Sequence, residues 1–509
     1  MKLVRYTVLF IIFGFISLTS GYPQNDGDNF FNSDQIHTFN ITFSQPNFWD
    51  SLTYNYTIDK FMAADVEIDG TMLPSTGVQL KGNSSYNSYP GQKKSMNIDF
   101  NEFVSGQDYD GLKKLNLNNG FKDPTMLREK IFLEFCKMIG MPAPRCTFGK
   151  VYINGTYWGL YTAVEQVNKS FLDIQFNDKK GNLFKGDPHG VLMWKGPTES
   201  NYYGDYELKT NEDINDWSDL VYLIDKINNT SPTAYYDTLE KYMDSDTYLK
   251  YWAANIIFSN LDSYTGSGHN YYIYHDSTSL KFKWIMWDVN EAFGNFNMGM
   301  DLNAIHGLDM FFIPNPQGPL SHKMLQNSTY YNMYIDKICD ITENFFRHDI
   351  LDPMIDSLAN AIRSDLYADT KKMFTNQQFE DNLTQAINVP GLPGGGNIAG
   401  LKSFITERRD SLQLQLAGFG CYLDINDNSY SDFTIIIYPN PASDQIHVIL
   451  AGNDIPDKLS VALINYTGQL KYTETLMRQN EFNIDISGLP AGIYLLTVNN
   501  ETGRKVVIN

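Results

Sequence analysis

The feature that most constrains the fold is a change of pattern near residue 420 of this 509-residue chain. Before it, over residues 30–417, short strand-like runs alternate with stretches of helical periodicity. After it, residues 434–509 consist of short apolar runs separated by Gly, Pro and Asn, which is typical of strands joined by tight turns. The sequence therefore predicts an α+β domain over 30–417, a polar linker over 418–433 and a small all-β sandwich over 434–509.

The N-terminus has the pattern of a secretory signal peptide over residues 1–21. Lys2 and Arg5 precede an apolar run over residues 8–16, which is too short to span a bilayer, and small residues follow it. No later segment approaches spanning length, so we expect no transmembrane anchor once the signal is removed.

The charge balance excludes some partners. The chain has 39 Lys and Arg against 59 Asp and Glu, a net charge of −20. Nucleic acids and anionic membranes attract basic surfaces, so neither is expected as a main partner.

The four cysteines leave the disulfide pattern open. None forms a Cys-x-x-Cys pair, which argues against a structural zinc site. Export permits a disulfide, and Cys136 and Cys146 are the nearest pair, but the sequence does not determine the connectivity. Cys136 lies on a predicted apolar helix, so a buried free thiol is the favoured interpretation there.

Residues 244–294 carry the strongest chemical signal. A helix predicted from about Ser245 to Phe258 leads into a loop with Asp262, and Asn270 begins a predicted hairpin that ends at Asp288. Carboxylate and amide oxygens suit Mg²⁺, which takes few protein ligands and completes its shell with phosphate and water. Asp288 and Asn270 are therefore candidate metal ligands, and Asp262 could orient or deprotonate a hydroxyl group.

Protein kinases share this order of an acid, an amide and a second acid. Here Asp262 and Asn270 are eight residues apart, against five in kinases, and no His-Arg-Asp motif is present. The alternative is that Asp262 and Asn270 cap turns while Asp288 accepts hydrogen bonds from the backbone.

Basic and acidic residues at element ends supply further candidates. Lys81 ends one predicted strand and Lys185 ends another, and a helix predicted to start at Asp123-Pro124 carries Arg128 and Glu129. A lone lysine at a strand end is more often surface decoration than a ligand. A structural ion pair is likewise the alternative for Lys81 and for Arg128.

The C-terminal segment resembles the sorting domain of the type IX secretion system. The matching stretches are Tyr438-Pro-Asn-Pro-Ala442, Asn465-Tyr-Thr-Gly-Gln469 and Ile486-Ser-Gly-Leu-Pro-Ala-Gly-Ile-Tyr-Leu495. The resemblance implies contact of residues 434–509 with the type IX machinery and a protein that is secreted or held on the outer cell surface.

Several motifs over roughly residues 40–415 resemble the spore coat protein H (CotH) kinase family. They are Gln79-Leu-Lys-Gly-Asn-Ser-Ser85, Leu115-Asn-Leu-Asn-Asn-Gly120, Met126-Leu-Arg-Glu-Lys130, Asn154-Gly-Thr-Tyr-Trp-Gly-Leu-Tyr161, Asn182-Leu-Phe-Lys-Gly186 and Trp284-Ile-Met-Trp-Asp-Val-Asn-Glu-Ala-Phe-Gly294. The resemblance implies an atypical protein-kinase-like fold that transfers the γ-phosphoryl group of ATP to Ser or Thr of a protein substrate, with Mg²⁺ or Mn²⁺.

Carried over to this sequence, the resemblance gives each candidate a role. Lys185 would contact the ATP phosphates, Asp262 would be the catalytic carboxylate and Asp288 would hold metal. Asn270 as second metal ligand is inferred from its place in the hairpin. Glu129 is a candidate ion-pair partner for Lys185, and Lys81 and Arg128 are further phosphate candidates.

Some members of the family are surface adhesins. A catalytically inactive adhesin or extracellular scaffold with the same fold is therefore the alternative function. A hydrolase with paired carboxylates has no supporting motif.

Overall fold

The structure is a computed structural model that describes residues 25–33, 35–89, 91–314, 318–391, 396–419, 421, 433–452, 455–465, 470–499 and 502–508. The predicted signal peptide over residues 1–21 and most of the predicted linker over 418–433 lie outside these ranges. The part before the linker mixes helices and strands, as the sequence predicts.

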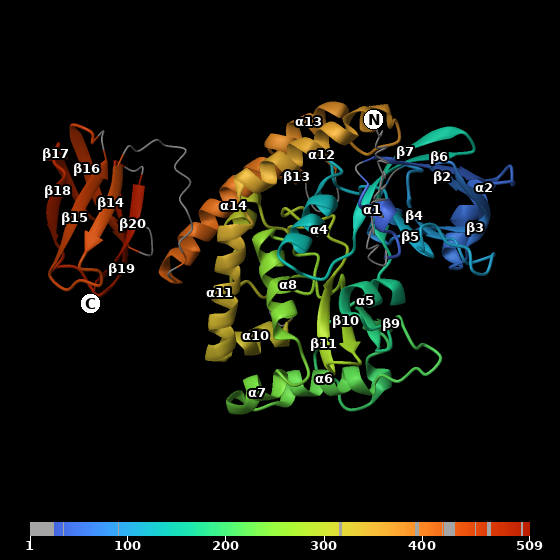
Figure 1. The fold of residues 1–509 in the computed structure, drawn as a ribbon, viewed down its shortest axis with the longest axis horizontal. Coiled ribbons are helices and arrows are strands. Elements are labelled where there is room, and N and C mark those ends of the chain that lie inside the picture. Colours follow the sequence, from blue (N-terminus) through green and yellow to red (C-terminus); the bar gives the residue numbers. More distant parts are fainter. Residues whose placement is uncertain are drawn as a thin grey trace, which may run out of the picture.

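Seven strands close into a barrel in the N-terminal part of the chain (Figure 1, blue to teal). The order is β1-β2-β3-β4-β5-β7-β6, and a parallel pairing of β1 with β6 closes the barrel. Buried and less buried positions alternate along β1 and β2, so one face of each strand lines an apolar core. The strands are β1 (His37–Thr42), β2 (Met62–Ile68), β3 (Thr71–Lys81), β4 (Ser95–Asp99), β5 (Lys114–Asn118), β6 (Cys146–Ile153) and β7 (Thr156–Glu165), with the helices α1 (Asp28–Phe31), α2 (Phe48–Thr57) and α3 (Ser84–Asn87).

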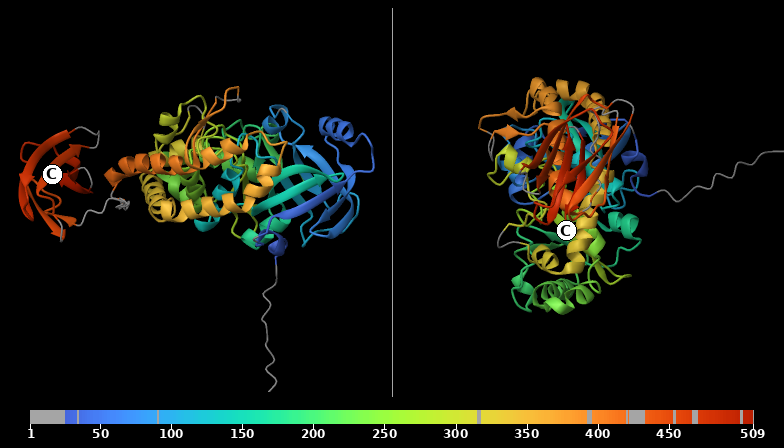
Figure 2. Two further views of the ribbon diagram at one scale, coloured as in Figure 1. Left: turned by 90° about the horizontal axis from the view of Figure 1, so that it is seen from above. Right: turned by 90° about the vertical axis from the view of Figure 1, so that its left-hand side faces the viewer.

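A four-stranded sheet and a set of helices form the next part of the chain. The sheet order is β11-β10-β8-β9, and the long helices α12 and α14 run beside one another (Figure 2, left). The strands are β8 (Leu183–Gly186), β9 (Tyr206–Leu208), β10 (Tyr271–Asp276) and β11 (Lys281–Met286), with a separate short pair β12 (Ile387–Asn388) and β13 (Asn397–Ile398). The helices are α4 (Arg128–Met138), α5 (Lys169–Phe176), α6 (Ser218–Asn229), α7 (Tyr235–Leu239), α8 (Ser245–Ile257), α9 (Leu302–His306), α10 (Pro319–Gln326), α11 (Ser328–Asn344), α12 (His348–Ala368), α13 (Asn376–Thr384) and α14 (Leu401–Leu416).

Helix α8 fixes the position of the loop that carries Asp262. The helix expected from about Ser245 to Phe258 is present, which confirms that prediction. The Asp244 carboxylate caps it by accepting a hydrogen bond from the backbone N–H of Thr247 at 3.2 Å. Nearly all of the helix is buried, including the polar residues Ser245, Thr247 and Asn255, so its C-terminal end has little freedom to move.

Helix α4 begins later than the sequence predicts. A start at Asp123-Pro124 was expected, but the helix starts at Arg128. Met126 has a left-handed φ of 59°, which interrupts the helical path before that point. Asp123 still caps the helix, because its carboxylate accepts hydrogen bonds from the backbone N–H groups of Thr125 and Arg128, each at 2.9 Å.

The C-terminal segment is all β, as the sequence predicts. It has one sheet of order β14-β15-β18 and another of order β17-β16-β19-β20. Apolar residues of both sheets belong to one core. The strands are β14 (Phe433–Tyr438), β15 (Gln445–Gly452), β16 (Lys458–Asn465), β17 (Leu470–Met477), β18 (Glu481–Asp485), β19 (Gly492–Val498) and β20 (Thr502–Ile508).

No helix in the described ranges is long and apolar enough to span a bilayer.

The structure determines the cysteine pairing that the sequence left open. Cys339, in α11, forms a disulfide with Cys421, which follows α14. Cys136 and Cys146 are buried free thiols, so the expectation for Cys136 is confirmed. The disulfide therefore ties the end of the α+β part back to α11.

We expect the double variant Cys339→Ser/Cys421→Ser to unfold at a lower temperature than the wild type. The cross-link spans 82 residues, and the chain-entropy model assigns a loop of that size about 4.5 kcal/mol. Thermal unfolding with and without a reductant measures this. The reductant should lower the wild-type midpoint and leave the variant unchanged, and an unshifted wild type would contradict a stabilising disulfide.

Candidate functional site

Two residues with strained backbone stand at one end of the β10–β11 hairpin. Asn270 precedes β10 with a φ of 58°, and Asp288 follows β11 with a φ of 53°. Tyr271 pairs with Met286, so the two candidates extend from the same end of the hairpin. Left-handed backbone is unusual for residues other than glycine and often marks functional sites.

The loop after α8 wraps around the carboxylate of Asp262. Asn270 Nδ2 donates to Asp262 Oδ2 at 3.0 Å, and Ser267 Oγ donates to Oδ1 at 3.2 Å. His269 Nε2 lies 2.8 Å from Oδ1. Burial acts to lower the pKa of His269, but the hydrogen bond to Asp262 and nearby negative charges raise it overall. Asp262 is therefore held in one orientation by its own loop.

Lys81 and Glu129 interact where the barrel meets helix α4. Lys81, the last residue of β3, donates to Asn116 Oδ1 at 2.8 Å. Glu129, in the first turn of α4, accepts from Asn118 Nδ2 at 2.9 and 3.0 Å. Burial lowers the pKa of Lys81 to about 8, against the opposite effects of Asp288 and Glu129. Burial also raises the pKa of Glu129 to about 7, and Asp288 adds to this rise.

Lys185 is on β8 and is paired with a different acid from the one expected. Its Nζ lies 2.5 Å from Asp187 Oδ2. Burial opposes its charge, but Tyr272 and Asp187 raise its pKa overall. Glu129 is not an ion-pair partner of Lys185 in the described residues: it accepts hydrogen bonds from Asn118, and Lys81 is the lysine whose charge lowers its pKa.

Asp288 interacts electrostatically with most of the other candidates. Burial is the largest influence on it and raises its pKa, while Lys81 and Lys185 lower it and Asp262 raises it further. The Asp288 side chain is nevertheless exposed, and Lys81, Lys185 and Asp262 all keep part of their surface accessible. The Asp288 carboxylate is therefore reachable by solvent while neighbouring charged groups still shift its pKa. We name Lys81, Lys185, Asp262 and Asp288 the charge cluster.

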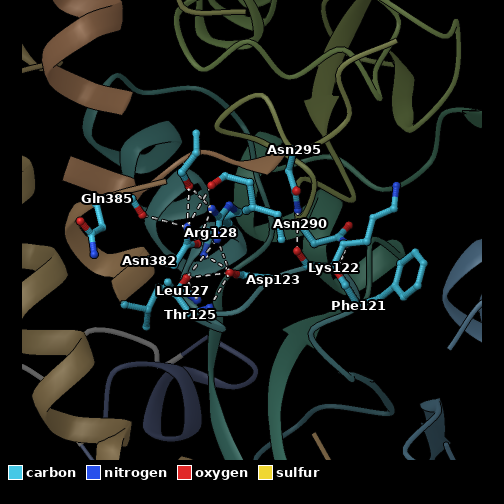
Figure 3. A network of polar contacts seen from close by, with 12 residues as sticks. Phe121, Lys122, Asp123, Thr125, Leu127, Arg128, Asn290, Asn295, Asn382 and Gln385 are labelled. Carbon is cyan, nitrogen blue, oxygen red and sulfur yellow. Dashed lines mark hydrogen bonds and ion pairs between the residues drawn. The ribbon is translucent and has the colours of Figure 1, made fainter. Parts of the chain in front are cut away.

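Arg128 does not belong to the charge cluster. Its guanidinium is fully buried and lies 2.5 Å from Asp123 Oδ1, in a network with Asn382 and the carbonyl of Ala399 (Figure 3). This matches the structural ion pair that was the alternative to phosphate binding.

The structure adds residues that the sequence reasoning did not single out. Glu291 pairs with Lys122 at 2.8 Å, and burial raises the pKa of Glu291 to about 7, with Asp262 and Asp288 contributing to the rise. The fully buried Arg408 donates to the carbonyl oxygens of Ile256 and Ile257 at the end of α8. The asparagines of β5 do carry a signal, because Asn116 and Asn118 alternate with leucines and therefore share one strand face.

A cavity of about 230 Å³ lies beside Lys122, and no member of the charge cluster lines it. Its lining includes Lys122, which bonds to Glu291 and so connects the cavity to the surroundings of Asp262 and Asp288. The other lining residues are Ser84, Ser88, Phe121, Asn295, Phe296, Asn297, Met298 and Gly299. They come from the segment after β3, from the loop between β5 and α4, and from the segment after Asp288.

The donor set fits a hard cation with few protein ligands. The side-chain nitrogen of Asn270 donates to Asp262. The side-chain oxygen of Asn270 is therefore left to bind a cation together with the Asp288 carboxylate. No group of three or more His, Cys, Asp or Glu that could hold a metal is found in the described ranges. Mg²⁺ that is bound together with phosphates needs only one or two carboxylates from the protein. The side chains of Asp288 and Asn270 are of the chemical type that such a site requires.

Comparison with known families identifies both parts of the chain. Residues 78–390 match the model of the CotH kinase protein family, so the chain belongs to that family. Residues 436–509 match the secretion system C-terminal sorting domain. Both resemblances drawn from the sequence motifs are thereby confirmed, and the sorting domain implies secretion and a cell-surface location.

Similar proteins come from a bacterium and from a fungus. The chain is 26% identical over 298 residues to inner spore coat protein H of Bacillus subtilis, covering 57% of this chain and 78% of that protein. It is 22% identical over 375 residues to invasin CotH2 of Rhizopus delemar, covering 67% of this chain and 61% of the invasin. It therefore spans about three fifths of that relative. The solved Helicobacter pylori proinflammatory kinase CtkA aligns with 54% of this chain and 93% of its own at 11% identity, with a TM-score of 0.23, too low to establish a shared fold.

The pKa of Glu129 predicts a pH-dependent stability difference. Because its folded pKa of about 7 lies above the ordinary value of 4.5, the folded state binds the proton more tightly. Ionising Glu129 therefore lowers stability as pH rises from about 4.5 to 7. Glu129→Gln lacks this loss, so its stability relative to the wild type should rise over that window and then level off.

Thermal unfolding in metal-free buffer at several pH values measures this difference. Glu134→Gln, which removes a more exposed carboxylate from the same helix, is the control. A Glu129→Gln difference that stays constant across the window would show that Glu129 titrates normally.

Proposed function

We propose that this protein is a secreted or cell-surface atypical protein kinase that transfers the γ-phosphoryl group of ATP to Ser or Thr hydroxyls of a protein substrate. Its α+β part then has an atypical protein-kinase-like architecture, with the barrel on one side of the nucleotide and the β10–β11 hairpin on the other.

The observation that supports this most is the charge cluster. Lys81, Lys185, Asp262 and Asp288 come from four separate segments, and each lysine interacts electrostatically with Asp288. Two lysines near two solvent-accessible carboxylates suit a triphosphate with its divalent cation. The phosphate oxygens would bind the lysines, and the metal would bind the carboxylates.

Asp288 and the Asn270 carbonyl oxygen are proposed to hold Mg²⁺ or Mn²⁺. When bound, the cation neutralises charge on the phosphates. Asp262 accepts the proton of the substrate's Ser or Thr hydroxyl. The oxygen of that hydroxyl bonds to the γ-phosphorus while ADP leaves. The hydrogen bonds from Asn270, Ser267 and His269 hold Asp262 ready for this proton transfer.

Lys81 and Lys185 are proposed to contact the phosphates. Glu129 orients Lys81, as the acid on the equivalent helix does for the strand lysine of protein kinases. Asp187 orients Lys185 in the same way from the end of β8.

A catalytically inactive adhesin is the second candidate function. It is favoured by the relatives from Rhizopus delemar that are named invasins. An adhesin of this fold has no need to bind nucleotide, which separates the two functions.

We expect Asp288→Asn to abolish Mg²⁺- or Mn²⁺-dependent phosphoryl transfer and the stabilisation of the protein by ATP. Removing one charge removes the proposed carboxylate ligand of the cation while keeping the size of the side chain. Labelled ATP with a general protein substrate, together with ATP-induced thermal shifts, measures both effects.

The matched control is Asp213→Asn, which changes an exposed aspartate outside the charge cluster. It should behave as the wild type does. Equal activity in Asp288→Asn and wild type would rule out the proposed metal site, and a wild type that neither binds ATP nor transfers phosphate would favour the adhesin.

The sorting domain is proposed to act through the type IX secretion machinery. A chain that ends at residue 433 should therefore accumulate in the periplasm of a type IX-competent host, whereas the full chain reaches the cell surface. Surface proteolysis of intact cells distinguishes the two locations. Surface exposure of the shortened chain would show that residues 434–509 are not needed for export.

A further inference from the structure

Arg128 is a fully buried cation at the first position of α4, the helix that carries Glu129. Its guanidinium bonds to Asp123 Oδ1, to Asn382 Oδ1 at 2.9 Å and to the carbonyl oxygen of Ala399 at 2.7 Å (Figure 3). Asn382 in turn donates to the carbonyl oxygen of Ala399 at 3.0 Å. Both terminal nitrogens of the guanidinium are bonded, although Nε has no hydrogen-bond partner among the described residues. A buried charge held by these contacts is hard to displace, because movement leaves it without partners.

This network joins α4 to a distant part of the chain. Asn382 lies on α13 and Ala399 follows β13, about 250 residues or more after Arg128. Arg128 also lies against the ring of Phe293, 6.0 Å from its centre, in the segment that follows Asp288. The Asp123 carboxylate accepts a hydrogen bond from the backbone N–H of Arg128 and also pairs with the Arg128 guanidinium. The first turn of α4 is therefore held through both its backbone and a side chain.

The loop before α4 also holds the segment after Asp288. Lys122 pairs with Glu291 at 2.8 Å, and its carbonyl oxygen accepts a hydrogen bond from Asn295 Nδ2 at 2.8 Å. Asn290 Nδ2 donates to the carbonyl oxygen of Phe121 at 3.4 Å. The loop thus contacts both the hairpin end and the helix that carries Glu129.

We propose that Arg128 and Asn382 are positioning residues that hold Glu129 beside Lys81. Asn382, on α13, and Ala399, after β13, then support the nucleotide site without touching the nucleotide. This inference rests on the proposed kinase function. Its consequence is that α4 cannot swing away from Lys81 without stranding a buried charge, so the site stays assembled without ligand or covalent modification.

Asn382→Ala tests the proposal, because Asn382 is not among the residues proposed to touch the nucleotide. We expect the Kd for Mg²⁺–ATP to rise about tenfold, measured by calorimetry on the full chain. A merely structural role lowers the melting temperature of the nucleotide-free protein but leaves this Kd unchanged, which would overturn the proposal. Gln377→Ala, on an exposed position of the same helix, is the control and should keep the wild-type Kd.

Two more variants keep the test decisive if Asn382→Ala folds poorly. Asn382→Asp keeps an oxygen for Arg128 but loses the amide that donates to the carbonyl oxygens of Ile398 and Ala399, so it should bind Mg²⁺–ATP more tightly than Asn382→Ala but less tightly than the wild type. Arg128→Lys keeps the charge but loses the planar fork that joins Asp123 to Asn382, so it should weaken binding as Asn382→Ala does. Equal Kd values for Asn382→Asp and Arg128→Lys would contradict the proposal.

Hydrogen exchange separates this inference from the proposed function, because it needs no nucleotide. In Asn382→Ala, amides of residues 119–131 should exchange faster, while those of the β10–β11 hairpin stay unchanged. If the wild type binds no nucleotide, the proposed kinase function fails. Hydrogen exchange alone then decides whether Asn382 positions α4. Unchanged exchange over 119–131 would overturn the positioning role.

Discussion

The repulsion between Asp288 and the carboxylates of Asp262 and Glu129 is the constraint on which the site depends. Burial is the largest cause of the raised pKa of both Asp288 and Glu129, and the charge of Asp262 raises that of Asp288 further, as the charge of Asp288 does for Glu129. Lys81 lowers the pKa of both groups and so offsets part of the repulsion. Such an arrangement reduces stability unless a ligand uses it, and perturbed carboxylates of this kind gather at functional sites. A bound cation with phosphates would satisfy both the acids and the lysines.

The rest of the molecule keeps these groups in place. Buried α8 and the carbonyl contacts of Arg408 fix the base of the Asp262 loop. The hairpin fixes Asn270 and Asp288 at one end, since their spacing is set by strand register. The Arg128 network fixes α4 from the far side. Three separate sets of contacts therefore determine where the charge cluster forms.

Local patterns made a large part of this predictable. The buried periodicity of α8 identified the helix. Asn154-Gly155, between β6 and β7, is a pair that favours a hairpin turn, and its two residues have φ values of 47° and 75°. Alternation and turn residues likewise identified the all-β tail. Asp262, Asn270 and Asp288 were placed together because a hairpin brings its two ends to the same point.

Contacts between distant segments were not predictable in the same way. Nothing near Arg128 in the sequence indicates Asn382, 254 residues away, so phosphate binding and a structural pair could not be separated. The partner of Glu129 depends on how α4 packs on the barrel, and a late helix start at Arg128 follows from the turn at Met126. The pairing of Cys339 with Cys421 also depends on tertiary packing.

The most direct test of the charge cluster is an anomalous diffraction map of crystals grown with Mn²⁺ and a non-hydrolysable ATP analogue. The account predicts a manganese peak bound by the Asp288 carboxylate, with the analogue's phosphates against Lys81 and Lys185. Manganese and nucleotide bound away from these residues, or no bound nucleotide at saturating concentration, would contradict it.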